Sequence, residues 1–187
     1  MEQRRLVELA RRGDHDAFAT LARAAVVRLD HAARLVLRDG ELARDAVQDG
    51  LFRAWRDLPG LRDPDRFDAW LHRLVINACL DLLRRRGRRV AEVELTSLDT
   101  YGGVDIAADF ADRDLIADAI ARLDPTRRAI VVMHYFLGMP LADVAEALEI
   151  PIGTVKSRLH RALGDMRVTV TTDPAMAPSP IPGGQVA

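Results

Sequence analysis

PLADVAEALEIPIGTVKSRLHRAL, residues 140–163, contains two apolar-periodic segments on either side of a tight break at Glu149-Ile150-Pro151. In the first segment, the apolar residues from Leu141 to Leu148 recur at i, i+3, i+4 and i+7, which is the spacing of one buried helix face. The second segment repeats this spacing with Ile152, Val155, Leu159, Ala162 and Met166. Two short helices joined by a compact turn predict a helix-turn-helix.

The second of these helices carries cationic and hydroxyl side chains away from its apolar face. Away from that face lie Thr154, Ser157, Arg158 and Arg161, while Lys156 and His160 lie on its other flank. Arginine pairs bidentately with guanine or phosphate, and serine and threonine bond to either, so this helix is chemically able to enter a DNA major groove. The same pattern also fits a solvated basic face on an ordinary helical hairpin. The compact break and the complete apolar face favour DNA binding.

The composition favours helices throughout the chain. Its 187 residues suffice for one domain or for two small helical ones, and 49% of them are apolar while 29% are charged. Aromatic residues reach only 5%, which argues against an aromatic-rich β-sandwich, and β alternation is not sustained in any window. We therefore predict an all-α fold. Helical periods cover residues 3–12, 15–38, 41–57, 64–86, 113–122, 125–137, 141–148 and 152–167.

Changes of composition divide the chain into two small helical domains, residues 1–90 and 113–168. Residues 91–112 contain glycines and acids without a firm period, so they predict a flexible acidic linker between the domains. Residues 169–187 are rich in proline and lack a large apolar cluster, so we expect a disordered tail.

Charge is segregated along the chain, although the net charge is only −1. Residues 80–90 and 150–167 are basic, whereas residues 91–118 contain eight acids and a single arginine. The near-zero total therefore conceals two basic segments, one in each predicted domain, that are suited to a nucleic-acid partner.

The sequence offers little to an enzyme or a metal site. The single cysteine, Cys79, excludes an intramolecular disulfide framework, and its apolar neighbours indicate an ordinary buried thiol rather than a nucleophile. Asp14-His15-Asp16 contains possible metal ligands, but no two of the five histidines are spaced at i, i+4. We expect no enzyme activity, no metal and no cofactor.

The sequence also lacks the patterns of membrane and secreted proteins. No apolar run approaches the ~18 residues of a membrane span. The N-terminus alternates charged with apolar residues instead of forming the apolar core of a secretory signal. We expect a cytoplasmic protein without membrane insertion.

A second informative helix is predicted around DAVQDGLFRAW, residues 45–55. Gly50 stands in its middle and costs about 1 kcal/mol relative to alanine. Leu58-Pro59-Gly60 is a clear stop signal after it. Its apolar residues have the spacing of a core-facing set, and its polar face consists of Asp45, Gln48, Asp49 and Arg53.

The predicted helix at residues 64–86 has an apolar face from Leu71 to Leu82 and a separate polar face. That polar face carries Arg73, Asn77, Asp81, Arg84 and Arg88. Its arginines can attract DNA phosphates without regard to sequence, so this face is a second candidate for DNA contact. Phe67 and Trp70, near the start of this helix, fit either a core position or a contact with such a partner.

These stretches resemble one known family. PIGTVKSRLHRAL, residues 151–163, closely resembles the recognition helix of region 4 in bacterial sigma-70 family sigma factors, especially the small extracytoplasmic-function (ECF) group, and LDPTRR at residues 123–128 extends the likeness. DAVQDGLFRAW and the following FDAWL at residues 67–71 resemble regions 2.2 to 2.4 of the same family. Gly50-Leu51-Phe52 departs from the usual pattern of a small or β-branched residue, phenylalanine and an aliphatic residue.

The resemblance implies an RNA polymerase sigma factor that directs promoter-specific initiation without an active site of its own. Its implied partners are core RNA polymerase, through the β′ clamp coiled coil and the β flap, promoter DNA, and an anti-sigma factor. The residues implied for core polymerase are Asp45, Gln48, Asp49 and Phe52. Those implied for the −10 element are Arg73, Asn77, Arg84 and Arg85. Those implied for the −35 element are Arg127, Arg128, Thr154, Lys156, Ser157, Arg158, His160 and Arg161.

A transcriptional regulator is the alternative, with a sensor domain in residues 1–90 and the same helix-turn-helix. A sensor predicts a ligand pocket or a phospho-acceptor strand. Because no strands are predicted and residues 45–77 carry the region 2 pattern, the sigma-factor interpretation is favoured.

Overall fold

The computed structural model describes residues 2–93 and 111–172, and every element in those ranges is helical. The predicted all-α class is thus confirmed for this part of the chain. The middle of the predicted linker and the part of the predicted tail beyond Thr172 lie outside the described residues.

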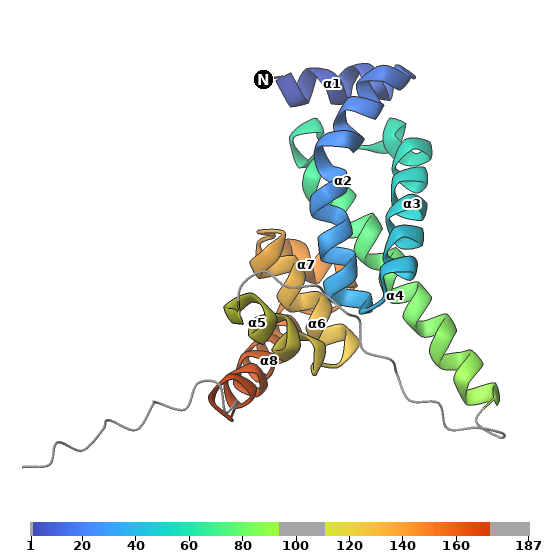
Figure 1. The fold of residues 1–187 in the computed structure, drawn as a ribbon. Helices are drawn as coiled ribbons and strands as arrows, with labels where there is room; N and C mark the ends of the chain where they lie inside the picture. The colour runs from blue at the N-terminus through green and yellow to red at the C-terminus, as the bar shows by residue number, and fades with distance from the viewer. Residues whose placement is uncertain (1, 94–110, 173–187) are drawn as a thin grey trace, which may run out of the picture.

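The first bundle contains four α-helices, and two short 3-10 helices, η1 (Leu58–Gly60) and η2 (Pro64–Arg66), join the last two of them. The four α-helices are α1 (Glu2–Arg11), α2 (His15–Leu37), α3 (Gly40–Asp57) and α4 (Phe67–Val93). In Figure 1, α2, α3 and α4 run along one another while α1 crosses one end of the bundle. Aspartates begin two of these helices: Asp14 accepts a hydrogen bond from the Ala17 N–H, and Asp39 caps α3 in the same way.

α3 and α4 approach each other closely at Gly50. A Cβ atom on Gly50 would lie 2.5 Å from Val75 Cγ2 and 3.0 Å from Val75 Cα, so α4 would have to move to admit a side chain. The glycine that weakens α3 by propensity is therefore what allows α4 to pack against it.

The second bundle also contains four α-helices. They are α5 (Ala111–Ala121), α6 (Pro125–Val131), α7 (Leu141–Leu148) and α8 (Ile152–Thr172). The sequence predicts one helix over residues 125–137, but the structure widens into a π-helical turn at Val132–Phe136. There the Leu137 N–H donates to the Val132 carbonyl, five residues back, at 2.9 Å.

The predicted helix-turn-helix is confirmed by α7 and α8. Glu149 ends α7 in the left-handed conformation, with φ of 55°, and the Ile150 N–H then donates to the Ala145 carbonyl at 3.1 Å. Pro151 directly precedes α8 and fixes the tight break that the sequence shows.

Two helices continue beyond their predicted ends. α4 extends past residue 86 to Val93, and α8 extends past residue 167 to Thr172, so the first residues assigned to the tail are helical. β-branched residues at 168–172 have low helix propensity, which is why the pattern suggested an earlier end. Extending an existing helix costs little, and Thr169 Oγ1 bonds back to the Asp165 carbonyl at 3.2 Å.

The two bundles pack against each other in this structure. Their buried apolar residues form one continuous cluster. Figure 1 shows the second bundle beside the C-terminal end of α2, and α7 also contacts α4. This contact places the helix-turn-helix directly against the helix predicted to meet the −10 element.

Candidate nucleic-acid interface

The outer face of α8 is open to solvent. Val155, Leu159 and Ala162 are buried on its inner side. The exposed side chains between them are Lys156, Ser157, His160 and Arg161. They present a cation, a hydroxyl group, an imidazole and a guanidinium to solvent, whereas the periodicity assigns Lys156 and His160 to a separate flank.

Arg158 lies elsewhere. It is half-buried and lines a crevice of about 360 Å³ with Leu80, Leu83 and Arg84 of α4. Thr154 is also half-buried, and its carbonyl accepts a hydrogen bond from Ser157 Oγ at 3.0 Å. Of the six predicted DNA contacts on α8, four thus share the open face, while Arg158 faces the first bundle.

The two arginines predicted on α6 differ from each other. Arg127 is half-buried and pairs with Asp124 at 3.0 Å and with Asp165 at 2.6 Å. Arg128 is only 7% exposed, and its guanidinium donates to the Val36, Ala121 and Leu123 carbonyls at 2.6, 3.1 and 2.8 Å.

Arg128 has a structural task in this arrangement. The Val36 carbonyl belongs to the last turn of α2, and the Ala121 carbonyl ends α5, so one cation caps two helix C-termini in two bundles. Burial lowers the pKa of Arg128 to about 10, and Arg38 adds to this effect, while Asp124 opposes it. The guanidinium is therefore withdrawn from DNA here, and its phosphate contact stays a prediction.

The polar face of α4 is covered by α7. Asn77 Nδ2 donates to the Ala147 carbonyl at 3.2 Å, and Arg73 Nη1 lies 3.8 Å from Glu146 Oε1. Further along α4, Arg84 and Arg85 are exposed, and Arg84 pairs with Asp81 at 2.9 Å. The predicted −10 set is therefore split into a covered pair and an open pair.

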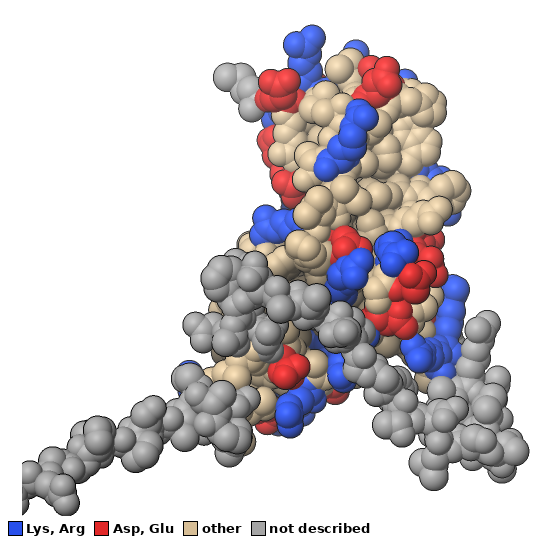
Figure 2. Space-filling view, in the orientation of Figure 1, with Lys and Arg blue, Asp and Glu red and all other residues tan. Residues whose placement is uncertain are grey.

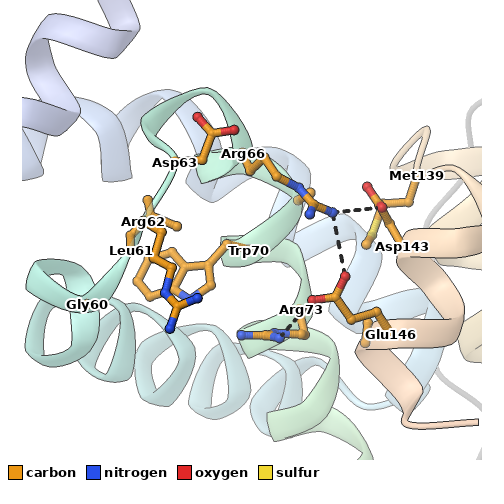
Figure 3. Close-up of a pocket in the computed structure, with 12 residues that line it drawn as sticks. Gly60, Leu61, Arg62, Asp63, Arg66, Trp70, Arg73, Met139, Asp143 and Glu146 are labelled. Atoms are coloured by element: carbon orange, nitrogen blue, oxygen red, sulfur yellow. Dashed lines mark hydrogen bonds and ion pairs between the residues drawn. The ribbon is translucent and has the colours of Figure 1, made fainter.

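A cleft of about 480 Å³ separates the start of α4 from α7 (Figure 3). The Gly60–Asp63 loop and Trp70 form one wall, and Asp143 and Glu146 of α7 stand on the other. Phe67 is 1% exposed and belongs to the core, whereas Trp70 is half-buried and lines the cleft. The two aromatic residues, equivalent in the sequence, thus have different surroundings.

The exposed face of α3 contains all four residues predicted for core polymerase. Asp45, Gln48 and Asp49 are exposed, Asp49 pairs with Arg53 at 2.5 Å, and the Phe52 side chain is 63% exposed. Phe52 therefore adds an exposed apolar ring to this polar face.

Sequence reasoning missed the other half of this surface. A shallow groove between α2 and α3 is floored by Val26, Val27, Val47 and Leu51 and includes Gln48. Val27 is 64% exposed. Figure 2 shows mostly uncharged surface over the neighbouring α2 and α3. The sequence does indicate this apolar surface, because Val26 and Val27 lie outside the apolar face of α2 that contains Leu21 and Leu29.

The described residues give little support to a nucleophilic cysteine or a metal site. Cys79 is buried, and burial raises the pKa of its thiol to about 12, so the nucleophilic thiolate is strongly disfavoured. Within residues 2–93 and 111–172, no group of three or more His, Cys, Asp or Glu side chains could hold a metal ion. No helix in the same ranges is long and apolar enough to cross a membrane.

Comparison with known proteins gives consistent matches. The family model of Sigma-70 region 2 matches residues 21–89, and that of Sigma-70, region 4 matches residues 113–166. The ECF RNA polymerase sigma factor SigM of Mycobacterium tuberculosis is 39% identical over 151 residues, which span 80% of this chain and 75% of SigM.

Two solved structures have the same fold. One is CnrH in complex with the cytosolic domain of CnrY, with a TM-score of 0.66 and 30% identity over 92% of this chain and 99% of that one. The other is the sigma factor RpoE in complex with the anti-sigma factor NepR from Bartonella quintana, with a TM-score of 0.67 and 22% identity over 82% and 98% of the two chains.

Proposed function

We propose that three surfaces of this chain bind core polymerase, the −10 promoter element and the −35 promoter element. The chain belongs to the extracytoplasmic-function (ECF) group of sigma-70 RNA polymerase sigma factors. Sigma factors are DNA-binding initiation factors, so the function of the chain is to direct RNA polymerase to promoters. The main support for giving the two bundles different binding roles is that the region 2 and region 4 models match different bundles. Each bundle has its own polar face.

The proposed surface for core polymerase is the outer face of α3 with the groove beside it. Asp45 and Asp49 supply charge, and Phe52 with the valine-lined groove supplies apolar area. An apolar centre with a polar rim suits an amphipathic helical partner. The clamp coiled coil of the polymerase β′ subunit is such a partner, and the β flap is proposed to hold the second bundle.

The proposed −10 surface is the polar face of α4 with the cleft at its start. Arg73 and Asn77 would contact the DNA strand, while Arg84 and Arg85 would attract phosphates. Trp70 stands at the cleft, where stacking could repay the cost of extruding a base. In this structure the Arg73 and Asn77 part is covered, so the proposal requires the bundles to separate.

The proposed −35 surface is the open face of α8. Lys156, Ser157, His160 and Arg161 are exposed together, and a helix of this width fits the major groove. Thr154 is half-buried beside this face, Arg158 faces the first bundle, and Arg127 is more exposed than the buried Arg128.

The chain is proposed to act by binding alone, in the cytoplasm, while the polymerase supplies the chemistry. An anti-sigma factor is proposed as its inhibitor, because RpoE, which has the same fold, is solved with one. A regulator with a sensor in residues 1–90 is not favoured, because the region 2 family model matches residues 21–89.

The core-binding proposal is tested by reversing two charges, Asp45→Arg with Asp49→Arg. Removing charged partners from a desolvated contact typically costs about 2–5 kcal/mol, so core polymerase should no longer be retained in a pull-down. The matched control is Glu2→Arg with Glu8→Arg on α1, which changes the net charge equally. Circular dichroism and melting temperature establish that both variants fold. Unchanged core binding by the folded α3 variant would contradict the proposal.

A further inference from the structure

The side chains proposed to contact the −10 strand already have partners in the other bundle. Asn77 donates to the Ala147 carbonyl, and Arg73 lies beside Glu146. Arg66, one turn before Trp70 and two turns before Arg73, pairs with Asp143 at 2.8 Å and with Glu146 at 3.6 Å (Figure 3).

The charges across this contact are complementary in a particular way. The cations come from α4 and the short turn before it, and the two carboxylates come from α7, the first helix of the helix-turn-helix. A carboxylate accepts the same charge-assisted hydrogen bonds from a guanidinium as a phosphate does. Asp143 and Glu146 therefore occupy donors that a DNA strand would need.

The remaining polar contacts between the bundles are hydrogen bonds from arginine side chains to backbone carbonyls. Water or DNA phosphates can accept the same hydrogen bonds. Arg28 donates to the Phe136 carbonyl at 2.7 Å, and Arg38 to the Ala121 carbonyl at 3.2 Å. Arg128 would lose its bond to Val36 on separation but keep two carbonyls within its own bundle. These polar contacts accompany the apolar cluster that the two bundles share, so opening exposes apolar area as well as these groups.

The groove between α2 and α3 lies outside this contact. None of its lining residues lines the cleft between α4 and α7. A partner can therefore reach the α3 surface while the bundles are packed together, which separates core docking from DNA contact.

We propose that α7 is a built-in competitor of DNA: Asp143 and Glu146 stand in for strand phosphates on Arg66 and Arg73 and keep the −10 surface of the free chain closed. This inference rests on the DNA role of α4 given under Proposed function. Its consequence is that the free chain binds single-stranded DNA less tightly than its exposed arginines alone would allow, and that opening the contact precedes strand capture.

The test neutralises the two carboxylates without changing their shape, by Asp143→Asn with Glu146→Gln in the full chain. The probe is a fluorescein-labelled single-stranded oligothymidine, without polymerase, at about 50 mM salt, where phosphate contacts are strong. Small-angle X-ray scattering measures the radius of gyration of the same samples. The matched control is Glu41→Gln with Glu149→Gln, which removes two exposed carboxylates outside the contact.

The expected result is a larger radius of gyration and oligothymidine binding about three- to tenfold tighter than wild type, with neither change in the control. An unchanged radius, or an equal gain in affinity by the control, overturns the competitor role. Expansion without a gain in affinity also overturns it, because the carboxylates then mask no DNA surface. Failure of the proposed function is seen separately, as Arg73→Ala and Asn77→Ala variants that bind core and open promoters normally.

Discussion

α4 and α8 carry the same kind of chemistry but present it differently. Both have a polar face with arginine and an uncharged hydrogen-bonding side chain opposite a buried apolar face. On α8 that face is open, with Lys156 and Arg161 exposed, whereas on α4 Arg73 and Asn77 contact α7. The comparison teaches that residue type and periodicity define a surface that can bind DNA, while packing between the bundles decides whether the surface is available.

The largest expected effect separates the two arginines of α6. Arg128→Ala leaves the Val36 and Leu123 carbonyls without this donor, while the Ala121 carbonyl keeps Arg38, so the free energy of unfolding should fall by about 2–4 kcal/mol in urea titration. Arg127→Ala removes partly exposed ion pairs and should cost less than about 1 kcal/mol. Equal, small losses for both variants would mean that Arg128 does not hold the bundles as its three bonds indicate.

The open face of α8 should read bases directly. Arg161→Ala is expected to cost about 1–3 kcal/mol in promoter binding by the reconstituted holoenzyme and to relax preference at one position of the −35 element. Arg127→Ala should weaken all promoters alike, since a phosphate contact carries no sequence information. The measurement is binding across a promoter library. A uniform loss for Arg161→Ala would remove it from base readout.

The covered face of α4 should respond differently with and without polymerase. In the free chain, Arg73→Ala both weakens the contact with α7 and removes a DNA contact, so its net effect on oligothymidine binding should be within about twofold. In a promoter complex with core polymerase only the lost contact counts, and affinity should fall about threefold or more. Lys156→Ala, on the open face, should weaken duplex binding in both settings. If both variants lose DNA affinity to the same extent in the free chain and in the promoter complex, the α4 surface is no more covered than the α8 surface.

Individual residues show which side-chain positions the sequence could predict and which it could not. The apolar spacing of α8 correctly predicts that Val155, Leu159 and Ala162 are buried, because a single helix has only one core-facing side. The same reasoning cannot place Arg158 or Arg128, whose positions depend on how a second bundle docks. Local periodicity contains no information on that docking.

Glycine and valine positions illustrate the same boundary. Gly50 looks like a defect in α3, and only the distance to Val75 shows that it sets the spacing between two helices. Val26 and Val27 lie off the apolar face of α2, which is a readable signal, but their partner surface on α3 is set by tertiary packing. The candidate sites could therefore be predicted as sets of residues, though not as covered or open surfaces.

The smallest expected effect concerns a histidine on each helix. His72, on α4, is 9% exposed, and within the described residues its Nδ1 has no hydrogen-bond partner. Burial lowers its pKa, nearby Arg28 lowers it further, and Asp68 partly opposes them. Because protonation is harder in the folded state than in the unfolded one, where histidine titrates near about 6.5, the fold should lose stability as the pH falls below that value.

The loss is limited to about 1.4 kcal/mol per pH unit for one group. His72→Leu should reduce the drop in unfolding free energy between about pH 7 and about pH 5.5, measured in urea, because it removes a group that takes up a proton on unfolding. His160→Leu, which removes an exposed histidine from the open face of α8, is the matched control. If both variants lose as much unfolding free energy between these pH values as wild type does, other groups cause the acid sensitivity. The buried histidine of α4 would then not differ from the exposed one of α8.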